Sequence, residues 1–312
     1  MPERFTQIPS GTPNGQPIIT GHEKIAPGHW LGRLTCLLAA KTAVSIFRGR
    51  KSGGLPQKSG QPFLPGSSIK GVVRSFAEAL THSCSPLPNQ AMHCQSRTTV
   101  CPACRLFGAQ FGRQEQQGEG AYQSKVLFSD AEAVGRIQSS LGEIMIHTHS
   151  RHPSPKGGRI FYQHFSPTIE PFGGQPGGKG RDNDHAAIEY VLPQSQFTFI
   201  VDFSNLAGDE LSLLLYSLVL EEGMAHKLGF GKAKGLGSIQ IQITHLQASN
   251  QPQEVYLSLT TPHFTHDLTS PEEISQFVQA RREPFLSRLD HNQVQQLRAT
   301  LALPPELRDP SS

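Results

Sequence analysis

The sequence predicts an α+β protein whose core is one antiparallel sheet covered by helices. Apolar segments of strand type are interspersed with two helical segments, with turn or loop residues between them. In chain order we expect a strand in 31–47, a helix that opens in the stretch 63–76 and runs to about Leu80, strands in 125–134 and 187–206, a helix in 208–223 and a strand in 238–243. This order is the split βαβ, or ferredoxin-like, arrangement, which RNA-recognition modules also use.

The strands are predicted from composition and alternation. Residues 31–47 are rich in apolar and β-favouring side chains, so they indicate a buried strand in which Cys36 is a core thiol. Residues 125–134 resemble a second strand in composition. In 187–206 every second residue from Phe197 to Phe203 is apolar, and residues 238–243 alternate in the same way.

The first helix is predicted from an apolar stripe that recurs with helical spacing. Its members are Ile69, Val72, Val73, Phe76 and Leu80. Ser67 or Ser68 is the expected N-cap, because a serine hydroxyl can accept a hydrogen bond from a free amide of the first turn.

The later helices carry their own start and stop signals. Residues 208–223 have acids in the first turn, where the helix dipole favours them, and Gly223 is the expected stop. The Ser-Pro-Glu-Glu segment at 270–273 is typical of a capping box and opens a helical tail of about two segments, to about Leu301.

The charges are unevenly distributed along the chain. Residues 25–114 contain eleven Lys or Arg and one acid, Glu78, whereas acids gather in the last sixty residues. A basic half suggests a polyanion as partner, and a scattered solvated surface is the alternative. No membrane-length apolar run and no signal peptide are visible, so we expect a soluble, cytoplasmic protein without a membrane partner.

Two segments are candidates for phosphate contact. The first is the start of the first helix, where free amides and Ser67 and Ser68 could hold an anion flanked by Lys70 and Arg74. The basic loop before this helix adds Arg48, Arg50 and Lys51 as candidates. The second is GFGKAKGLGS, whose glycines and lysines are Lys227, Gly229, Gly231, Lys232, Lys234, Gly235 and Gly237. Its spacing and its place after a helix exclude a dinucleotide fingerprint. A tight turn before a strand is the alternative to contact with a phosphate backbone.

Three motifs together resemble the RAMP superfamily of CRISPR-associated proteins. LPGSSIKGVVRSF and LGFGKAKGLGS match a serine-rich turn before the first helix and a glycine-rich loop before the last strand. CPACRLFG at 101–108 is similar to an element of subunits of type III effector complexes. The resemblance covers about residues 30–245. It implies a ferredoxin-like core that binds CRISPR RNA and complementary target RNA beside other subunits of the complex.

This resemblance also implies a division of the chain. Residues 1–29 are expected to be an N-terminal extension, 30–250 the RAMP domain and 251–312 a helical C-terminal tail. Within the domain, 81–112 is expected to be a zinc insertion. Residues 147–186, rich in His, Pro and Gly, are expected to be a thumb-like insertion that wedges into the guide–target duplex.

Four cysteines lie within twenty-one residues and predict a structural zinc site. They are Cys84, Cys94, Cys101 and Cys104, and the last two form a C-x-x-C turn that directs two thiolates at one centre. The gaps are not those of a standard zinc finger, so His82 or His93 could replace one cysteine. Four unrelated reduced thiols are the alternative.

Catalysis is the rival hypothesis to binding. His147 and His149 could act as general acid and base in RNA cleavage, with Asp182 or Asp184 as carboxylate. In target-cleaving subunits of the family an aspartate lies between the first strand and the first helix, but the loop 48–62 has no Asp or Glu. We therefore expect a binding subunit of a type III complex. A target-cleaving subunit or a guide-processing endoribonuclease is the alternative.

Overall fold

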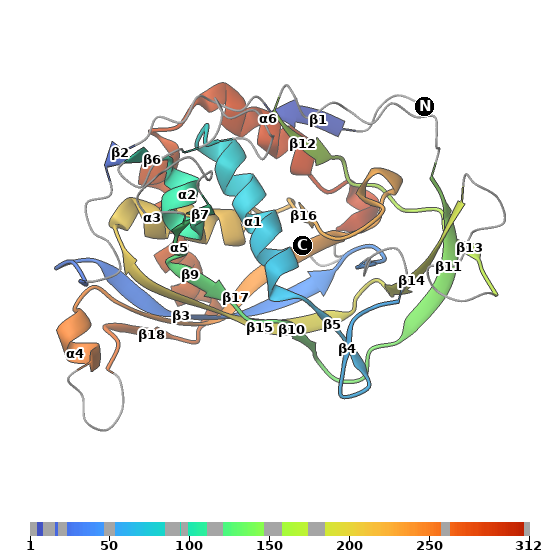
Figure 1. Cartoon of the computed structure of the whole chain (residues 1–312), viewed down its shortest axis with the longest axis horizontal. Helices are drawn as coiled ribbons and strands as arrows, with labels where there is room; N and C mark the ends of the chain where they lie inside the picture. The colour runs from blue at the N-terminus through green and yellow to red at the C-terminus, as the bar shows by residue number, and fades with distance from the viewer. Residues whose placement is uncertain are drawn as a thin grey trace.

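The computed structural model describes residues 5–8, 16–17, 24–46, 54–84, 94, 99–110, 121–146, 158–173, 185–256 and 263–308. Its main layer is a nine-stranded, curled antiparallel sheet, and helices cover one face of that sheet (Figure 1). The strand order is β16-β17-β3-β15-β10-β5-β4, with β18 on β17 and β9 on β15. The strands of this sheet are β3 (Trp30–Ala40), β4 (Gln57–Lys58), β5 (Gln61–Leu64), β9 (Val126–Phe128), β10 (Ala131–Ala133), β15 (Gln196–Leu206), β16 (His226–Lys227), β17 (Ser238–Ser249) and β18 (His266–Leu268).

Smaller sheets and the helices complete the described chain. The remaining strands are β1 (Phe5–Ile8), β2 (Gln16–Pro17), β6 (Thr99–Val100), β7 (Ala109–Gln110), β8 (Ala121–Tyr122), β11 (Ser139–Met145), β12 (Arg159–Tyr162), β13 (Glu170–Pro171) and β14 (His185–Val191). The helices are α1 (Gly66–Leu80), α2 (Pro102–Phe107), α3 (Gly208–Leu218), α4 (Pro252–Tyr256), α5 (Pro271–Leu286) and α6 (His291–Leu301), with the 3-10 turns η3 (Lys232–Lys234) and η4 (Pro305–Leu307).

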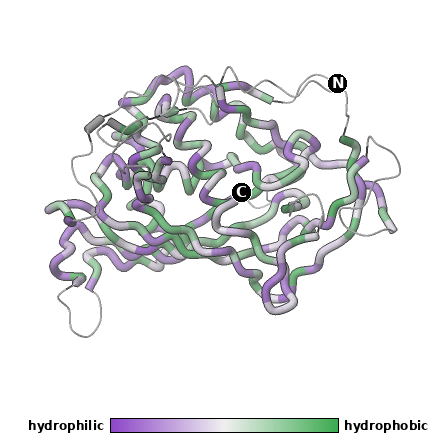
Figure 2. Tube along the Cα trace, in the orientation of Figure 1, coloured by the Kyte–Doolittle hydropathy of each residue, from purple (hydrophilic) through white to green (hydrophobic). Residues whose placement is uncertain are grey.

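Three long strands form the centre of the main sheet. In β3, Cys36 lies opposite Phe199 of β15 on one side and Ile243 of β17 on the other. Burial raises the pKa of its thiol, as expected for a core cysteine. In Figure 2 hydrophobic residues follow the sheet and the helices above it. Buried side chains of these elements form the main hydrophobic core.

Helix α1 lies over this sheet with the predicted stripe inward. Ile69, Val73, Phe76 and Leu80 are buried, whereas Val72 is partly buried. The Phe76 ring packs edge-on against Tyr216 of α3, with ring centroids 5.4 Å apart. The C-terminal helices join the same core, because Leu297 and Leu301 of α6 are also buried in it.

The serine cap predicted for α1 is wrong. The N-cap is Pro65, without a side-chain hydrogen bond, and Ser67 and Ser68 lie inside the first turn. Asp130 replaces the serine, because its carboxylate accepts from the Gly66 amide at 2.8 Å. A Cβ at position 66 would lie 2.5 Å from the Phe128 carbonyl oxygen, so the glycine allows the helix to start against the β9–β10 backbone.

Other boundaries also differ from the sequence-based expectations. The strand expected in 125–134 is two short strands, β9 and β10. At the break, the Ser129 hydroxyl rather than its backbone carbonyl accepts from the Ile200 amide, at 2.9 Å. The strand region 187–206 is divided at a turn where Gln194 has a φ of 69°, and β14 pairs with β11 in a three-stranded sheet. Helix α3 ends at Leu218 rather than at Gly223, and Ser270 makes no capping hydrogen bond at α5.

A buried carboxylate ties α3 to the elements beside it. Glu210 accepts from Lys125 Nζ at 3.0 and 2.9 Å, and Arg105 Nε of α2 lies 2.9 Å from its Oε1. The same carboxylate accepts from the Ala207 amide at 2.8 Å, which caps α3. Lys125, Arg105 and the Ala207 amide therefore all contact one buried carboxylate.

Replacing this acid should destabilise the fold. Glu210→Ala leaves Lys125 buried without its carboxylate, so we expect the free energy of unfolding to fall by about 3–5 kcal/mol in denaturant titrations. Glu132→Ala is the matched control, because Glu132 pairs with Lys58 on the exposed surface and its loss should leave the transition almost unchanged. Equal effects of the two substitutions would contradict this assignment.

Candidate metal centre and nucleic-acid interface

Four thiols meet at the N-terminus of α2. Cys101 is the N-cap of this helix, Cys104 lies in its first turn, and Cys84 and Cys94 come from the segment between α1 and α2. The four sulfur atoms lie within 4.8 Å of one another and all four residues are buried. The Sγ atom of Cys84 is 3.3 Å from that of Cys104 and 3.7 Å from that of Cys101. Tetrahedral zinc with Zn–S bonds of about 2.3 Å requires S–S separations of about 3.8 Å.

The surroundings of the four thiols suit a thiolate centre. The Cys101 amide donates to Cys94 Sγ at 3.1 Å, and the Cys104 amide donates to Cys101 Sγ at 3.4 Å. Outside the four thiols, Arg74 Nη2 donates to Cys104 Sγ at 3.5 Å. The sulfur positions and these donors therefore fit a metal bound by four cysteines.

Of the two histidines considered as substitute ligands, the structure describes only His82, which is not in this cluster. His82 is half exposed, and its Nε2 lies 3.9 Å from a carboxylate oxygen of Asp290. His93 lies outside the described residues.

A second feature brings the two predicted phosphate-binding segments together. A cleft of about 360 Å³ lies between α1, β12 and residues 227–232. Its lining residues are Ser68, Gly71, Val72, Ser75, Ile160, Phe161, Tyr162, His226, Lys227, Leu228, Gly229, Lys232 and Leu301. Ser68 therefore faces the same space as Lys227, Gly229 and Lys232, which are about 160 residues away in the sequence.

The glycines of residues 229–237, the glycine loop, allow a close approach of the chain to itself. Gly237 has a φ of 79°, and a Cβ there would lie 1.9 Å from the Leu228 carbonyl oxygen. At Gly229 a Cβ would lie 2.2 Å from the Ser45 carbonyl oxygen. Gly231 and Gly235 flank η3. The loop is thus held against the segment that follows β3, and its residues Gly229 and Lys232 border the cleft.

The lysines of this region are held by backbone carbonyls. Lys227 Nζ donates to the Gly235 and Leu236 carbonyls at 2.9 and 3.0 Å, and Lys232 Nζ donates to Gly229 at 2.7 Å. Burial lowers the pKa of Lys227 to about 7, helped by the charge of Lys232. Burial also lowers the pKa of Lys232, whereas Lys234 is partly exposed at the end of η3.

Lys70 and Arg74 have partners within the chain. Lys70 Nζ donates to Ser124 Oγ at 2.8 Å, and burial lowers its pKa. Arg74 donates to Glu78 and to the Gly108 carbonyl as well as to Cys104. Neither residue lines the cleft.

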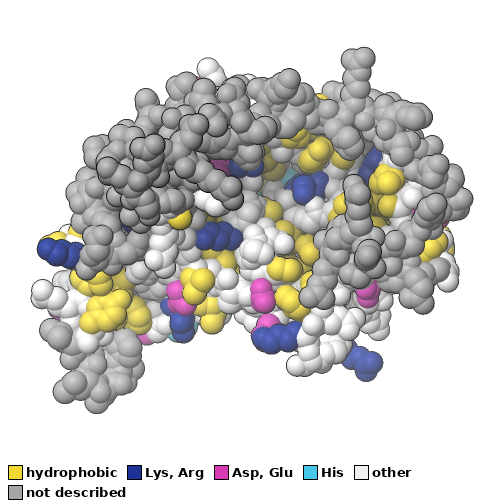
Figure 3. Space-filling model, viewed as in Figure 1, with side chains coloured by type: hydrophobic (Ala, Val, Ile, Leu, Met, Phe, Trp, Pro, Cys, Tyr) yellow, Lys and Arg dark blue, Asp and Glu magenta, His cyan; other side chains and the backbone are white. Residues whose placement is uncertain are grey.

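Several basic residues of the span 25–114 pair with acids from other parts of the chain, so the local excess of positive charge in the sequence is partly balanced in the structure. Arg33 pairs with Asp202 at 2.6 Å, Arg105 pairs with Glu210, and Lys58 pairs with Glu132. In Figure 3 the Lys and Arg side chains drawn in colour are spread over the face shown, and acids lie beside several of them. Arg48, Arg50 and Lys51 lie outside the described residues.

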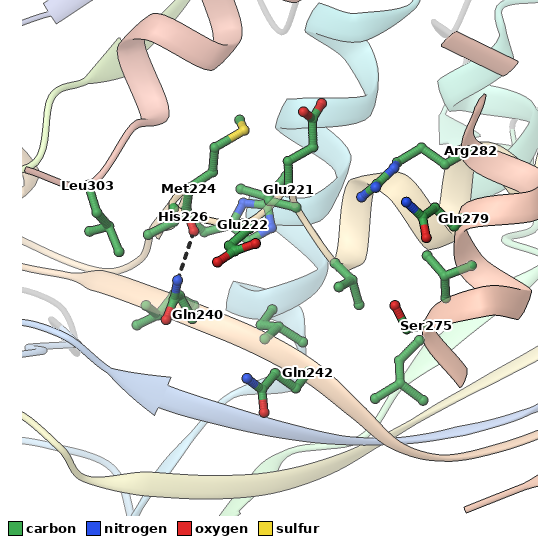
Figure 4. Close-up of a pocket in the computed structure, with 18 of the residues that line it drawn as sticks. Glu221, Glu222, Met224, His226, Gln240, Gln242, Ser275, Gln279, Arg282 and Leu303 are labelled. Atoms are coloured by element: carbon green, nitrogen blue, oxygen red, sulfur yellow. Dashed lines mark hydrogen bonds between the residues drawn. The ribbon is translucent and has the colours of Figure 1, made fainter. Parts of the chain in front are cut away.

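A larger cavity lies elsewhere and contains none of the predicted site residues. It has a volume of about 960 Å³ and lies between the outer edge of β17, the loop after α3 and helix α5. Figure 4 shows Gln240 donating to the Met224 carbonyl at its floor, with Glu222 and Arg282 at the sides. Arg298 and Tyr216 hold Glu221 at the rim.

The candidate catalytic residues are not described by the structure. Asp182, Asp184, His147 and His149 all lie outside the described residues, so their catalytic role stays a prediction. Among the described histidines, His164 and His226 are buried, and desolvation lowers their pKa values to about 3 and 4. His164 Nδ1 lies 2.9 Å from Ser238 Oγ and its Nε2 lies 3.0 Å from the Ala225 carbonyl, which fixes the segment after β12 to β17.

Comparison with known proteins identifies the family of this chain. The model of the RAMP superfamily matches residues 51–240, a stretch that contains α1, the four cysteines and the glycine loop. The chain therefore belongs to the RAMP superfamily of CRISPR-associated proteins, which its motifs resemble. No curated protein matches the sequence.

One similar solved structure is the crystal structure of Csc2 from Thermofilum pendens. It is 17% identical in sequence, and the match covers 89% of this chain and 83% of that chain at a TM-score of 0.38.

The described helices include none that is both long and apolar enough to cross a membrane.

The glycine loop gives a direct test of its packing. Gly237→Ala forces a Cβ into the Leu228 carbonyl at a positive φ, so we expect the free energy of unfolding to fall by more than about 1 kcal/mol. Gly71→Ala is the control, because Gly71 is exposed on α1 with open space at its Cβ, and alanine there should stabilise the helix by up to about 1 kcal/mol. Thermal unfolding followed by circular dichroism measures both, and a stable Gly237→Ala variant would contradict the described loop.

Proposed function

We propose that this protein is a CRISPR RNA-binding backbone subunit of a type III effector complex, and that the cleft between α1 and the glycine loop holds part of the guide's sugar-phosphate backbone. The observation that carries the proposal is the convergence of two distant motifs on one cleft. Ser68 and Ser75 come from α1, and Lys227 and Lys232 come from the region of the glycine loop.

The chemistry of the cleft suits a phosphodiester. Serine and tyrosine hydroxyls can donate to phosphate oxygens, and lysine ammonium groups supply positive charge. Burial disfavours the charged forms of Lys227 and Lys232, so a phosphate beside them would offset part of that cost. Phe161 and Tyr162 of β12 give the same cleft an aromatic wall on which a base can stack.

We infer that the core of the chain is ferredoxin-like. The six elements expected for it correspond to β3, α1, the β9–β10 pair, β15, α3 and β17. Their strands lie in the order β17, β3, β15, β9/β10, with antiparallel neighbours, which is the order of a split βαβ fold. In this arrangement the glycine loop precedes the last core strand.

The four cysteines are proposed to bind a structural zinc ion. Four sulfur ligands without an open position favour a structural rather than a catalytic role. The residues that would hold the ion are Cys84, Cys94, Cys101 and Cys104. They would join the end of α1 to the start of α2, so zinc would fix the segment between these helices.

Metal analysis tests the zinc site. The purified protein should contain about one zinc per chain, and Cys101→Ser with Cys104→Ser should remove the metal and lower the melting temperature. Cys36→Ala is the control, because this core thiol lies outside the cluster and its loss should leave the zinc content unchanged. Well under one zinc per wild-type chain would reject the site.

RNA binding tests the cleft. Lys232→Ala should weaken binding of all single-stranded RNA sequences alike and reduce the log–log salt slope by about 0.7, because one phosphate contact is lost. Lys58→Ala removes the same charge at an exposed site outside the cleft, so it should have much less effect. A change of sequence preference in Lys232→Ala would mean that this residue reads bases.

Copurification from the native host with sequencing of the bound RNA tests the assignment to a CRISPR complex. This assignment predicts short guides with a uniform 5′ end.

A further inference from the structure

Arg74 connects the four-cysteine cluster to the interior of the fold. Its Nη2 donates to Cys104 Sγ at 3.5 Å, its Nη1 to the Gly108 carbonyl at 2.9 Å and its Nε to Glu78 Oε1 at 2.7 Å. The cluster and the carbonyl that ends α2 therefore share one guanidinium with an acid of α1.

Glu78 continues this connection to the wall of the cleft. Its side chain is only 3% exposed, and its second oxygen pairs with Arg159, the first residue of β12. The next three residues of β12, Ile160, Phe161 and Tyr162, line the cleft. A continuous series of contacts thus runs from Cys104 through Arg74, Glu78 and Arg159 to β12.

We propose that Arg74 is a positioning residue of the metal centre, and that the series Arg74–Glu78–Arg159 couples metal binding to the position of β12 and so to polyanion binding in the cleft. The coupling rests on the proposed RNA-binding function of that cleft. It gives a physical role to a basic residue that the sequence alone suggests for direct contact with phosphate.

The charges support this role. A divalent metal with four thiolates carries a net charge of −2, and Arg74 is the cation that contacts a sulfur of the cluster among the described residues. Without the metal, Cys84 and α2 lose their common anchor, and Arg74 loses the fixed sulfur that orients it. Glu78 is shared by two guanidiniums, so a displacement of Arg74 changes the position at which Glu78 holds Arg159.

Reciprocity follows from thermodynamics. If metal binding strengthens RNA binding, RNA must strengthen metal binding by the same factor.

The first experiment uses the unmodified full-length protein. A fluorescein-labelled single-stranded RNA is titrated with zinc-loaded protein, with protein stripped by a chelator, and with stripped protein to which zinc is returned. We expect the dissociation constant to rise about fivefold or more on stripping and to recover with zinc. An unchanged dissociation constant in a stripped protein that remains folded by circular dichroism overturns the coupling.

The second experiment measures metal affinity in variants. Arg74→Ala should weaken Co²⁺ binding about 10–100-fold in chelator competition and alter the thiolate-to-cobalt absorption band, and Arg74→Lys should restore part of the loss. Lys70→Ala is the matched control, because it removes a cation from the same helix that contacts Ser124 rather than the cluster. Equal metal affinity in Arg74→Ala and Lys70→Ala rejects the positioning role.

Glu78→Gln separates coupling from direct electrostatics. This substitution removes a negative charge, so a direct electrostatic effect would leave RNA binding unchanged or stronger. Coupling predicts weaker RNA binding, because Gln holds Arg74 and Arg159 less firmly. Unchanged or tighter binding in a folded Glu78→Gln protein overturns the coupling. If this variant does not fold, the metal-stripping experiment on the wild type decides.

Failure of the coupling is distinguishable from failure of the proposed function. A wild-type protein that binds no RNA contradicts the function of the cleft. A wild type that binds RNA and metal independently retains both sites and loses only the coupling.

Discussion

The placement of helix α1 is the constraint on which both candidate sites depend. Its first turn is pressed against the β9–β10 backbone, where only glycine fits at position 66, and Asp130 holds the first amide. One face of α1 fills the core, and another supplies Ser68 and Ser75 to the cleft. The same helix carries Arg74, which contacts Cys104, and Glu78, which pairs with Arg74. A shift of this helix would disturb all three at once.

The glycine loop lies across the cleft from α1. Its backbone is fixed against Ser45 and Leu228, and Lys227 and Lys232 are in turn held by carbonyls of the loop region. Fixing a cation before the ligand arrives reduces the conformational entropy that binding must remove. The cleft is therefore bordered by lysines that the chain already holds in place, which supports the proposal that it contacts a sugar-phosphate backbone.

Local patterns in the sequence predict the features that depend on local chemistry. The stripe of α1 and the four-cysteine cluster follow from spacing alone, since periodicity and ligand type are properties of short segments. The interaction partners of charged residues do not follow from local patterns. Arg33 pairs with Asp202, and Arg74 donates to the Gly108 carbonyl. These partners are far away in the sequence, so the sequence pattern shows the cations but not the groups that bind them. The break between β9 and β10 at Ser129 is not predicted for the same reason: it depends on a hydrogen bond that the Ser129 hydroxyl accepts from Ile200 of β15.

The sheet register has a consequence for how the chain folds during synthesis. The central strand β3 pairs on both sides with strands made much later, as the neighbours of Cys36 are Phe199 and Ile243. At translation rates of about 5–20 residues per second, the second neighbour emerges about 10–40 s after the first strand. Both edges of this apolar strand are open until β15 has been made, and closing so long a loop is slow. The first part of the chain therefore cannot complete its sheet until the segment ending at Ser249 has left the ribosome.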